Sequence, residues 1–147
     1  MKRRITIFAI AALTLAGFAP AYADGPDLIA VRQAAFDLNN GDFAFIRSVV
    51  AAKGDVKPLE VPAKAIARWA GVIPTMFPPG TDKGGNTKAL PEIWSDTAGF
   101  QKAAMNMQAA ATKLAESAKA DDADAVAADT KALGDACGAC HRTFRAK

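Results

Sequence analysis

The stretch from Pro91 to Lys119, PEIWSDTAGFQKAAMNMQAAATKLAESAK, decides the fold of this chain. Its apolar and small residues recur at alternating intervals of four and three, which is the spacing of one face of an α-helix. The positions are Ile93, Thr97, Phe100, Ala104, Met107, Ala111, Leu114 and Ala118. Pro91 is tolerated in a first helical turn. The pattern predicts one long amphipathic helix that buries a single stripe.

Three further segments show helical periodicity, and clusters of proline, glycine and polar residues separate them. They run from Asp27 to about Lys53, from Val61 to Ile73, and from Asp122 or Asp124 to the C-terminal residues. No alternating strand pattern and no solenoid repeat is visible. We therefore expect an all-α protein, an antiparallel four-helix bundle.

The first segment is the least regular of the four, because Asn39-Asn40-Gly41-Asp42 lies in its middle. Helical spacing nevertheless continues on both sides of this interruption. The apolar positions that keep the spacing are Leu28, Val31, Ala35, Leu38, Phe45 and Val49. We expect one helix or two coaxial pieces.

The N-terminus has the layout of a secretory signal peptide. Lys2, Arg3 and Arg4 precede an apolar run, and Ala21-Tyr22-Ala23, with small residues at its two outer positions, precedes the expected cleavage point. A retained membrane anchor would need roughly 20 apolar residues, and Pro20 interrupts this run. We expect residues 1–23 to be removed and residues 24–147 to form one exported, periplasmic domain.

Removal of that segment changes the charge of the chain. Three of its 18 basic residues lie before residue 24 and none of its 15 acidic residues does, so the mature chain is balanced. The sequence therefore gives no electrostatic indication of a nucleic-acid partner or of stable membrane association.

Both cysteines and the only histidine lie together in Cys137-Gly138-Ala139-Cys140-His141. Cys-x-x-Cys-His is the attachment signature of c-type haem, in which both thiols bond to the haem and the imidazole binds the iron. A thioredoxin-like pair would be expected beside a βαβ pattern, a structural zinc site needs four ligands, and a plain disulfide leaves His141 unexplained. The motif predicts one covalently bound haem c near the C-terminus.

With this motif in its last helix, the chain resembles the cytochrome c′ family, the class II c-type cytochromes. Further resemblance lies in Arg32-Gln33, Met76 to Thr81 and Ile93-Trp94. The resemblance implies thioether bonds at Cys137 and Cys140, iron ligation by His141, and propionate contacts from Arg32 and Gln33. It also implies that Arg145 lies beside the proximal face. A solvated Arg32 and a helix-terminal cation at Arg145 are the alternatives.

Phe36 decides which kind of class II cytochrome the resemblance implies. Low-spin members supply a methionine as sixth iron ligand four residues after the arginine, where this chain has Phe36. We expect a five-coordinate, high-spin iron that binds small gases such as NO and CO and takes part in electron transfer. The alternative is a six-coordinate, low-spin electron carrier whose sixth iron ligand is a methionine elsewhere in the chain. Met107 is more simply interpreted as a core residue than as this ligand. An enzyme is not expected, because peroxidase-like chemistry needs a distal base and the sequence has no second histidine to provide one.

Family members usually form homodimers through their first two helices, and the redox partner is not identified by the sequence. Apolar residues of the first segment could supply such a face or could belong to the core. They are Phe43, Phe45, Ile46, Val49 and Val50.

Overall fold

The structure is a computed structural model and describes residues 27–147. The predicted signal peptide, residues 1–23, lies outside the described residues. Within residues 27–147, no helix combines the length and the hydropathy that a membrane span requires.

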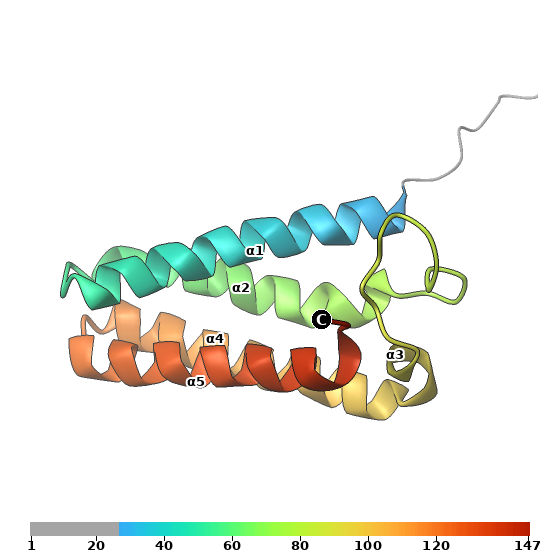
Figure 1. Ribbon diagram of the computed structural model, residues 1–147. Helices are drawn as coiled ribbons and strands as arrows, with labels where there is room; N and C mark the ends of the chain where they lie inside the picture. The colour runs from blue at the N-terminus through green and yellow to red at the C-terminus, as the bar shows by residue number, and fades with distance from the viewer. Residues whose placement is uncertain (1–26) are drawn as a thin grey trace, which may run out of the picture.

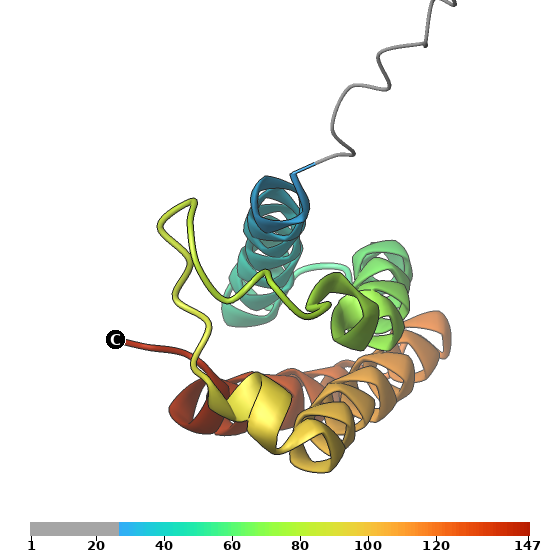
Figure 2. The same cartoon turned by 90° about the vertical axis from the view of Figure 1, so that its right-hand side faces the viewer.

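Four long helices form an antiparallel bundle, which confirms the predicted all-α fold (Figure 1). They are α1 (Leu28–Ala51), α2 (Glu60–Val72), α4 (Thr97–Lys119) and α5 (Ala123–Phe144). Seen along the bundle, α1 and α2 form one layer and α4 and α5 the other (Figure 2). Short elements complete the chain: α3 (Glu92–Ser95) and two 3₁₀ turns, η1 (Lys57–Leu59) and η2 (Ile73–Met76).

The third predicted helix is interrupted, which corrects the expectation of a single helix from Pro91. Asp96 leaves helical geometry, with φ −121° and ψ 63°, and its carboxylate accepts a hydrogen bond of 2.9 Å from the Gly99 N–H. An aspartate that caps a new helix N-terminus in this way ends the preceding one. Thr97 is exposed, whereas the stripe from Phe100 to Ala118 is buried as predicted, Met107 included.

The first helix is continuous through Asn39 to Asp42, as one of the two expectations had it. Val31 and Leu38, which keep the apolar spacing, are exposed, Leu38 by 75%. The side that faces the bundle carries Ile29, Arg32, Asn39 and Ile46. Hydrophobic periodicity alone does not identify this inward side, because two of its four residues are polar.

The last helix begins where the sequence indicated and packs closely on α4. Asp122 is the N-cap residue, and its carboxylate accepts from the Ala125 N–H at 2.9 Å. Farther along α5, the buried Asp129 carboxylate accepts from the Ser117 hydroxyl of α4 at 2.6 Å and pairs with Lys113 at 3.2 Å. This polar clasp and the buried Leu133 fix α5, which carries the cysteines, against α4.

Candidate functional site

Cys137, Cys140 and His141 lie in the last two turns of α5. Both cysteines are partly buried, pack against the hydrophobic core and are free thiols. Positions three and four apart on a helix share a face, so the two sulfurs and the imidazole emerge on the same side. His141 itself is exposed. The site is therefore a pair of half-buried thiols beside an accessible imidazole.

The surroundings favour the uncharged forms of all three groups. Burial raises the pKa of the Cys137 thiol, and burial together with nearby Cys137 raises the pKa of Cys140 to about 11. Although His141 is exposed, neighbouring protein atoms remove part of the hydration of its imidazole, and this effect, followed by the positive charge of Arg145, lowers the pKa of His141. At neutral pH the imidazole nitrogen therefore keeps the lone pair that a metal ion needs.

Phe36 lies on the inward side of α1, where it meets α2. Its ring stands edge-on to the Trp69 ring, with centroids 5.2 Å apart and planes at 84°. Within residues 27–147, two buried side-chain polar atoms lack a hydrogen-bond partner, Asn39 Oδ1 and Trp69 Nε1. Asn39 lies one turn beyond Phe36, and Trp69 touches Phe36. Polar atoms of this kind are usually satisfied by a partner, so the pair marks the place where a polar group is expected.

Arg32 is buried, with 2% of its surface exposed, so it is not the solvated surface residue that was one of the two expectations. Its guanidinium donates to Met76 O, Thr81 Oγ1, Thr81 O and Thr87 Oγ1, at 2.7–3.2 Å. It also stacks over the Phe77 ring at 4.2 Å. Gln33 donates to Gly85 O at 3.0 Å. Both residues thus bind the segment that follows α2, and their contact with haem propionates stays a prediction.

Arg145 follows α5 and belongs to a short backbone pairing that the sequence did not indicate. It forms an antiparallel bridge with Ala89. The Leu90 N–H donates to Phe144 O at 3.1 Å, and the Ala146 N–H donates to Lys88 O at 2.8 Å. We call these contacts the C-terminal strap. The sequence around Ala89 and Arg145 has no alternating apolar pattern, because a single bridge does not require a regular β-strand.

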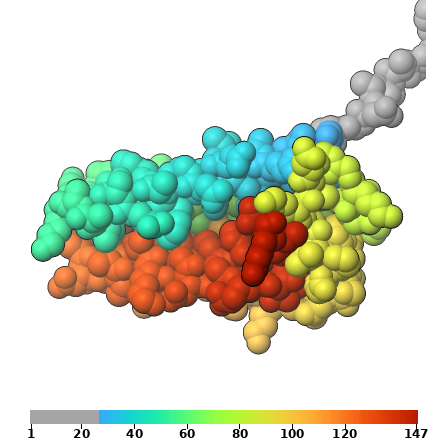
Figure 3. Space-filling model, viewed as in Figure 1, coloured from blue at the N-terminus to red at the C-terminus, as the bar shows by residue number. Residues whose placement is uncertain are grey.

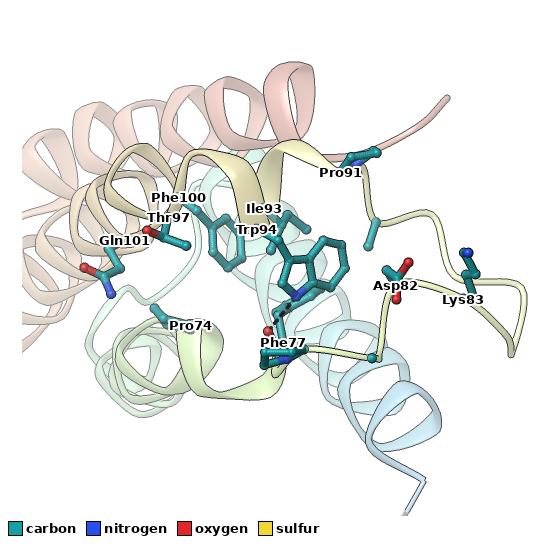
Figure 4. Close-up of a pocket in the computed structure, with 13 residues that line it drawn as sticks. Pro74, Phe77, Asp82, Lys83, Pro91, Ile93, Trp94, Thr97, Phe100 and Gln101 are labelled. Carbon is teal, nitrogen blue, oxygen red and sulfur yellow. Dashed lines mark hydrogen bonds between the residues drawn. The ribbon is translucent and has the colours of Figure 1, made fainter.

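A cavity of about 650 Å³ lies at the same end of the bundle, between the loop after α2 and the start of α4 (Figure 4). Phe77, Trp94 and Phe100 supply its aromatic wall, and the Trp94 indole donates to Phe77 O at 3.0 Å. None of the motif residues lines it. Its wall touches α5 through the Phe100 and Phe144 rings, whose centroids are 5.2 Å apart.

The residues present fit a covalently attached haem better than the competing sites. A haem could bond to the two thiols and take the neutral imidazole as an iron ligand. Its polar edge could supply hydrogen-bond partners for the unpaired Trp69 and Asn39 atoms. In residues 27–147, no group of three or more His, Cys, Asp and Glu side chains is placed to hold a metal ion, which argues against structural zinc. The described elements are helices, without the βαβ context of a thioredoxin-like pair.

Comparisons with known proteins show the family of the chain. The family model of cytochrome c′ matches residues 27–145. The cytochrome c′ of Rhodospirillum rubrum is 35% identical over 99% of both chains. The crystal structure of cytochrome c′ from Thermochromatium tepidum superposes with a TM-score of 0.77, at 28% identity, and covers 82% of this chain and 95% of that one.

A variant of cytochrome c prime from Alcaligenes xylosoxidans, solved as a nitric oxide complex, has a TM-score of 0.75 at 31% identity and covers 85% of this chain and 98% of that one. The helical architecture, the Cys-x-x-Cys-His motif in the last helix and the full-length match agree with one another, and the chain belongs to the cytochrome c′ family.

Proposed function

We propose that this chain is a periplasmic c-type haem protein whose five-coordinate, high-spin iron binds small neutral gases and exchanges electrons. Bound haem supplies a redox-active iron with one open coordination position. Cys137 and Cys140 would hold it through thioether bonds, and His141 would be the iron ligand. The observation that carries the proposal is Phe36, which stands on the inward side of α1 and has no atom that can bind iron.

The methionines within residues 27–147 are poorly placed to serve as the sixth iron ligand that Phe36 cannot supply. Met107 is buried in the core stripe of α4, and Met105 is exposed on the same helix. Met76 lies in the turn after α2, where its carbonyl accepts a hydrogen bond from Arg32. These positions support an iron whose sixth position is open.

Similar proteins support gas binding as the use of that open position. Variants of the Alcaligenes xylosoxidans cytochrome c prime were solved with nitric oxide and with carbon monoxide bound. In this chain, the half-buried Phe36 ring would form an apolar cover over the gas. Peroxidase-like activity is not part of the proposal, because His141 is the only histidine and serves the proximal side.

The test is the ultraviolet-visible spectrum of the purified mature protein, ferric and ferrous, with and without carbon monoxide and nitric oxide. We expect high-spin spectra that shift with both gases. A low-spin spectrum that carbon monoxide leaves unchanged would refute the proposal and favour the six-coordinate electron carrier. Phe36→Met should become low-spin if residue 36 faces the iron, whereas Phe43→Met, two turns along the same helix, should not.

The export proposal has its own test. N-terminal sequencing of the protein isolated from the periplasm should begin at Asp24, because cleavage is expected after Ala23. A chain that keeps residues 1–23 would be membrane-anchored instead.

We further propose that two copies associate through the outer sides of α1 and α2. Val31, Leu38 and Phe45 are exposed and lie seven residues apart in a row along α1. Val61 and Val72 are exposed on α2. Of the residues considered for the interface, Phe45 faces outward, whereas Ile46 is fully buried and Phe43, Val49 and Val50 pack against the core.

Light scattering of the holoprotein tests this association. The wild-type protein should have the mass of a dimer, and Leu38→Glu should shift it to the monomer, because a charge would enter an apolar contact. One related cytochrome c′ is described as having a ligand-controlled dimer dissociation, so the gas should be excluded from this experiment.

A further inference from the structure

Arg32 connects α1 to the loop that follows α2 through hydrogen bonds and through stacking on an aromatic ring. Four hydrogen bonds run from its two terminal nitrogens to Met76, Thr81 and Thr87. A guanidinium has five N–H groups, so only the Nε–H is left for another partner. The flat side of the same group lies 4.2 Å from the Phe77 ring centre.

These contacts depend on the shape of the guanidinium as well as on its charge. The planar fork serves acceptors at both ends of the 76–87 segment at once, which the single ammonium of a lysine cannot do. Burial costs the charge its hydration, and the four acceptors are carbonyls and hydroxyls rather than a carboxylate. The loop is therefore organised around the arginine.

The other end of the same loop is tied to α5. In the C-terminal strap, Leu90 and Lys88 are hydrogen-bonded to Phe144 and Ala146. Thr87 accepts from Arg32 and also from the Ala89 N–H at 3.3 Å, next to the strap. A continuous set of contacts thus runs from Arg32 on α1 through the loop to the end of α5, three residues beyond His141. The loop and the C-terminus lie side by side at this end of the molecule (Figures 1 and 3).

We propose that Arg32 is a positioning residue that holds the 76–90 loop between α1 and the end of α5. Through the loop it fixes the spacing between Phe36, one turn along α1, and His141 on α5. Arg32 thereby limits how far Phe36 moves when a gas enters. That Arg32 holds the loop does not depend on the proposed gas binding. The effect of Arg32 on Phe36 does depend on the proposed gas binding.

Hydrogen exchange of the holoprotein tests the holding of the loop. The amides of Leu90 and Ala146 report on the strap. The variants are Arg32→Gln, Arg32→Lys, and Thr81→Val with Thr87→Val, which removes two acceptors and leaves the charge of Arg32 unchanged. Thr75→Val is the matched control, since the Thr75 hydroxyl donates to Val72 O and has no contact with Arg32.

We expect exchange of both amides to rise by about tenfold or more in Arg32→Gln and in the double threonine variant, because each loses hydrogen bonds to a charged group. Arg32→Lys should not restore protection, and Thr75→Val should match the wild type. Protection that persists in the double threonine variant, or that lysine restores, would overturn the proposal, because the charge alone would then be sufficient.

The rate of carbon monoxide binding to the ferrous protein tests the effect on Phe36. We expect it to rise several-fold in Arg32→Gln and in the double threonine variant. Loosened strap amides with an unchanged rate would refute the link to Phe36. A wild-type protein that binds no carbon monoxide would refute the proposed function and this link together, while the exchange data would still decide whether Arg32 holds the loop.

Discussion

Replacing Phe36 with alanine should speed the binding of carbon monoxide to the ferrous protein. In the structure the Phe36 ring rests edge-on against Trp69, with centroids 5.2 Å apart. Such a contact contributes about 0.5–1.5 kcal/mol beyond the burial of area. A gas that reaches the iron by displacing the ring must overcome that contact. Since about 1.4 kcal/mol is tenfold in a rate, the variant should bind about 2- to 12-fold faster.

The assay is stopped-flow mixing of the ferrous protein with carbon monoxide, followed in the Soret band. Phe43→Ala is the matched control, because Phe43 is a half-buried phenylalanine two turns farther along α1, against Gly134 of α5. Both variants should lower the free energy of unfolding by about 1–3 kcal/mol, less than the full-burial value. Only Phe36→Ala should change the rate. Equal acceleration in both variants, or none in Phe36→Ala, would refute the assignment of Phe36 as the gas cover.

Three further changes follow from the packing and the protonation of this chain. Ser117→Ala should lower the free energy of unfolding in urea denaturation by about 1.5–3 kcal/mol, because it leaves the buried Asp129 carboxylate without its 2.6 Å hydrogen bond. Lys113→Met, which removes the exposed partner of the same carboxylate, should cost less than about 1 kcal/mol. Equal losses in the two variants would contradict this expectation. Asp96→Ala should cost about 1 kcal/mol by removing the N-cap of α4, and an unchanged urea midpoint would be inconsistent with that cap. In the haem-free protein, the rate of alkylation of Cys140 should keep rising up to about pH 11, the pKa of its thiol. The free energy of unfolding should fall as the pH rises toward that value, because the thiol loses its proton first in the unfolded chain. An alkylation rate that levels off near pH 9 would mean an ordinary thiol.

Helices with a single apolar side could be predicted from the sequence. The stripe from Phe100 to Ala118 is buried where the spacing placed it, and Asp122 caps α5 as expected. The haem motif could be found without the structure, since its five residues are contiguous and chemically specific. These successes share a cause, because each depends on neighbouring residues within one helix.

Interactions between distant segments could not be predicted in this way. Whether the Arg32 guanidinium is solvated or buried depends on the carbonyls of a loop more than forty residues away, Met76 among them. The C-terminal strap joins Lys88 to Ala146 through backbone atoms, which carry no sequence signal. The break at Asp96 was missed because the apolar spacing runs through it, although an aspartate there is also a good N-cap.

The apolar outer side and the partly polar inner side of α1 follow from one physical argument. A helix that packed only against its own bundle would place Leu38 inside and Asn39 outside, yet Leu38 is 75% exposed and Asn39 is buried with an unpaired Oδ1. Full burial of a leucine contributes about 1.5–3 kcal/mol, so leaving a row of such residues in water is costly unless another surface covers it. A buried amide is likewise costly without a polar partner. Both costs are reduced if α1 packs against a polar-edged haem on one side and against a second copy of the chain on the other, as proposed above. On that reading, α1 is shaped by partners that hydrophobic periodicity does not measure.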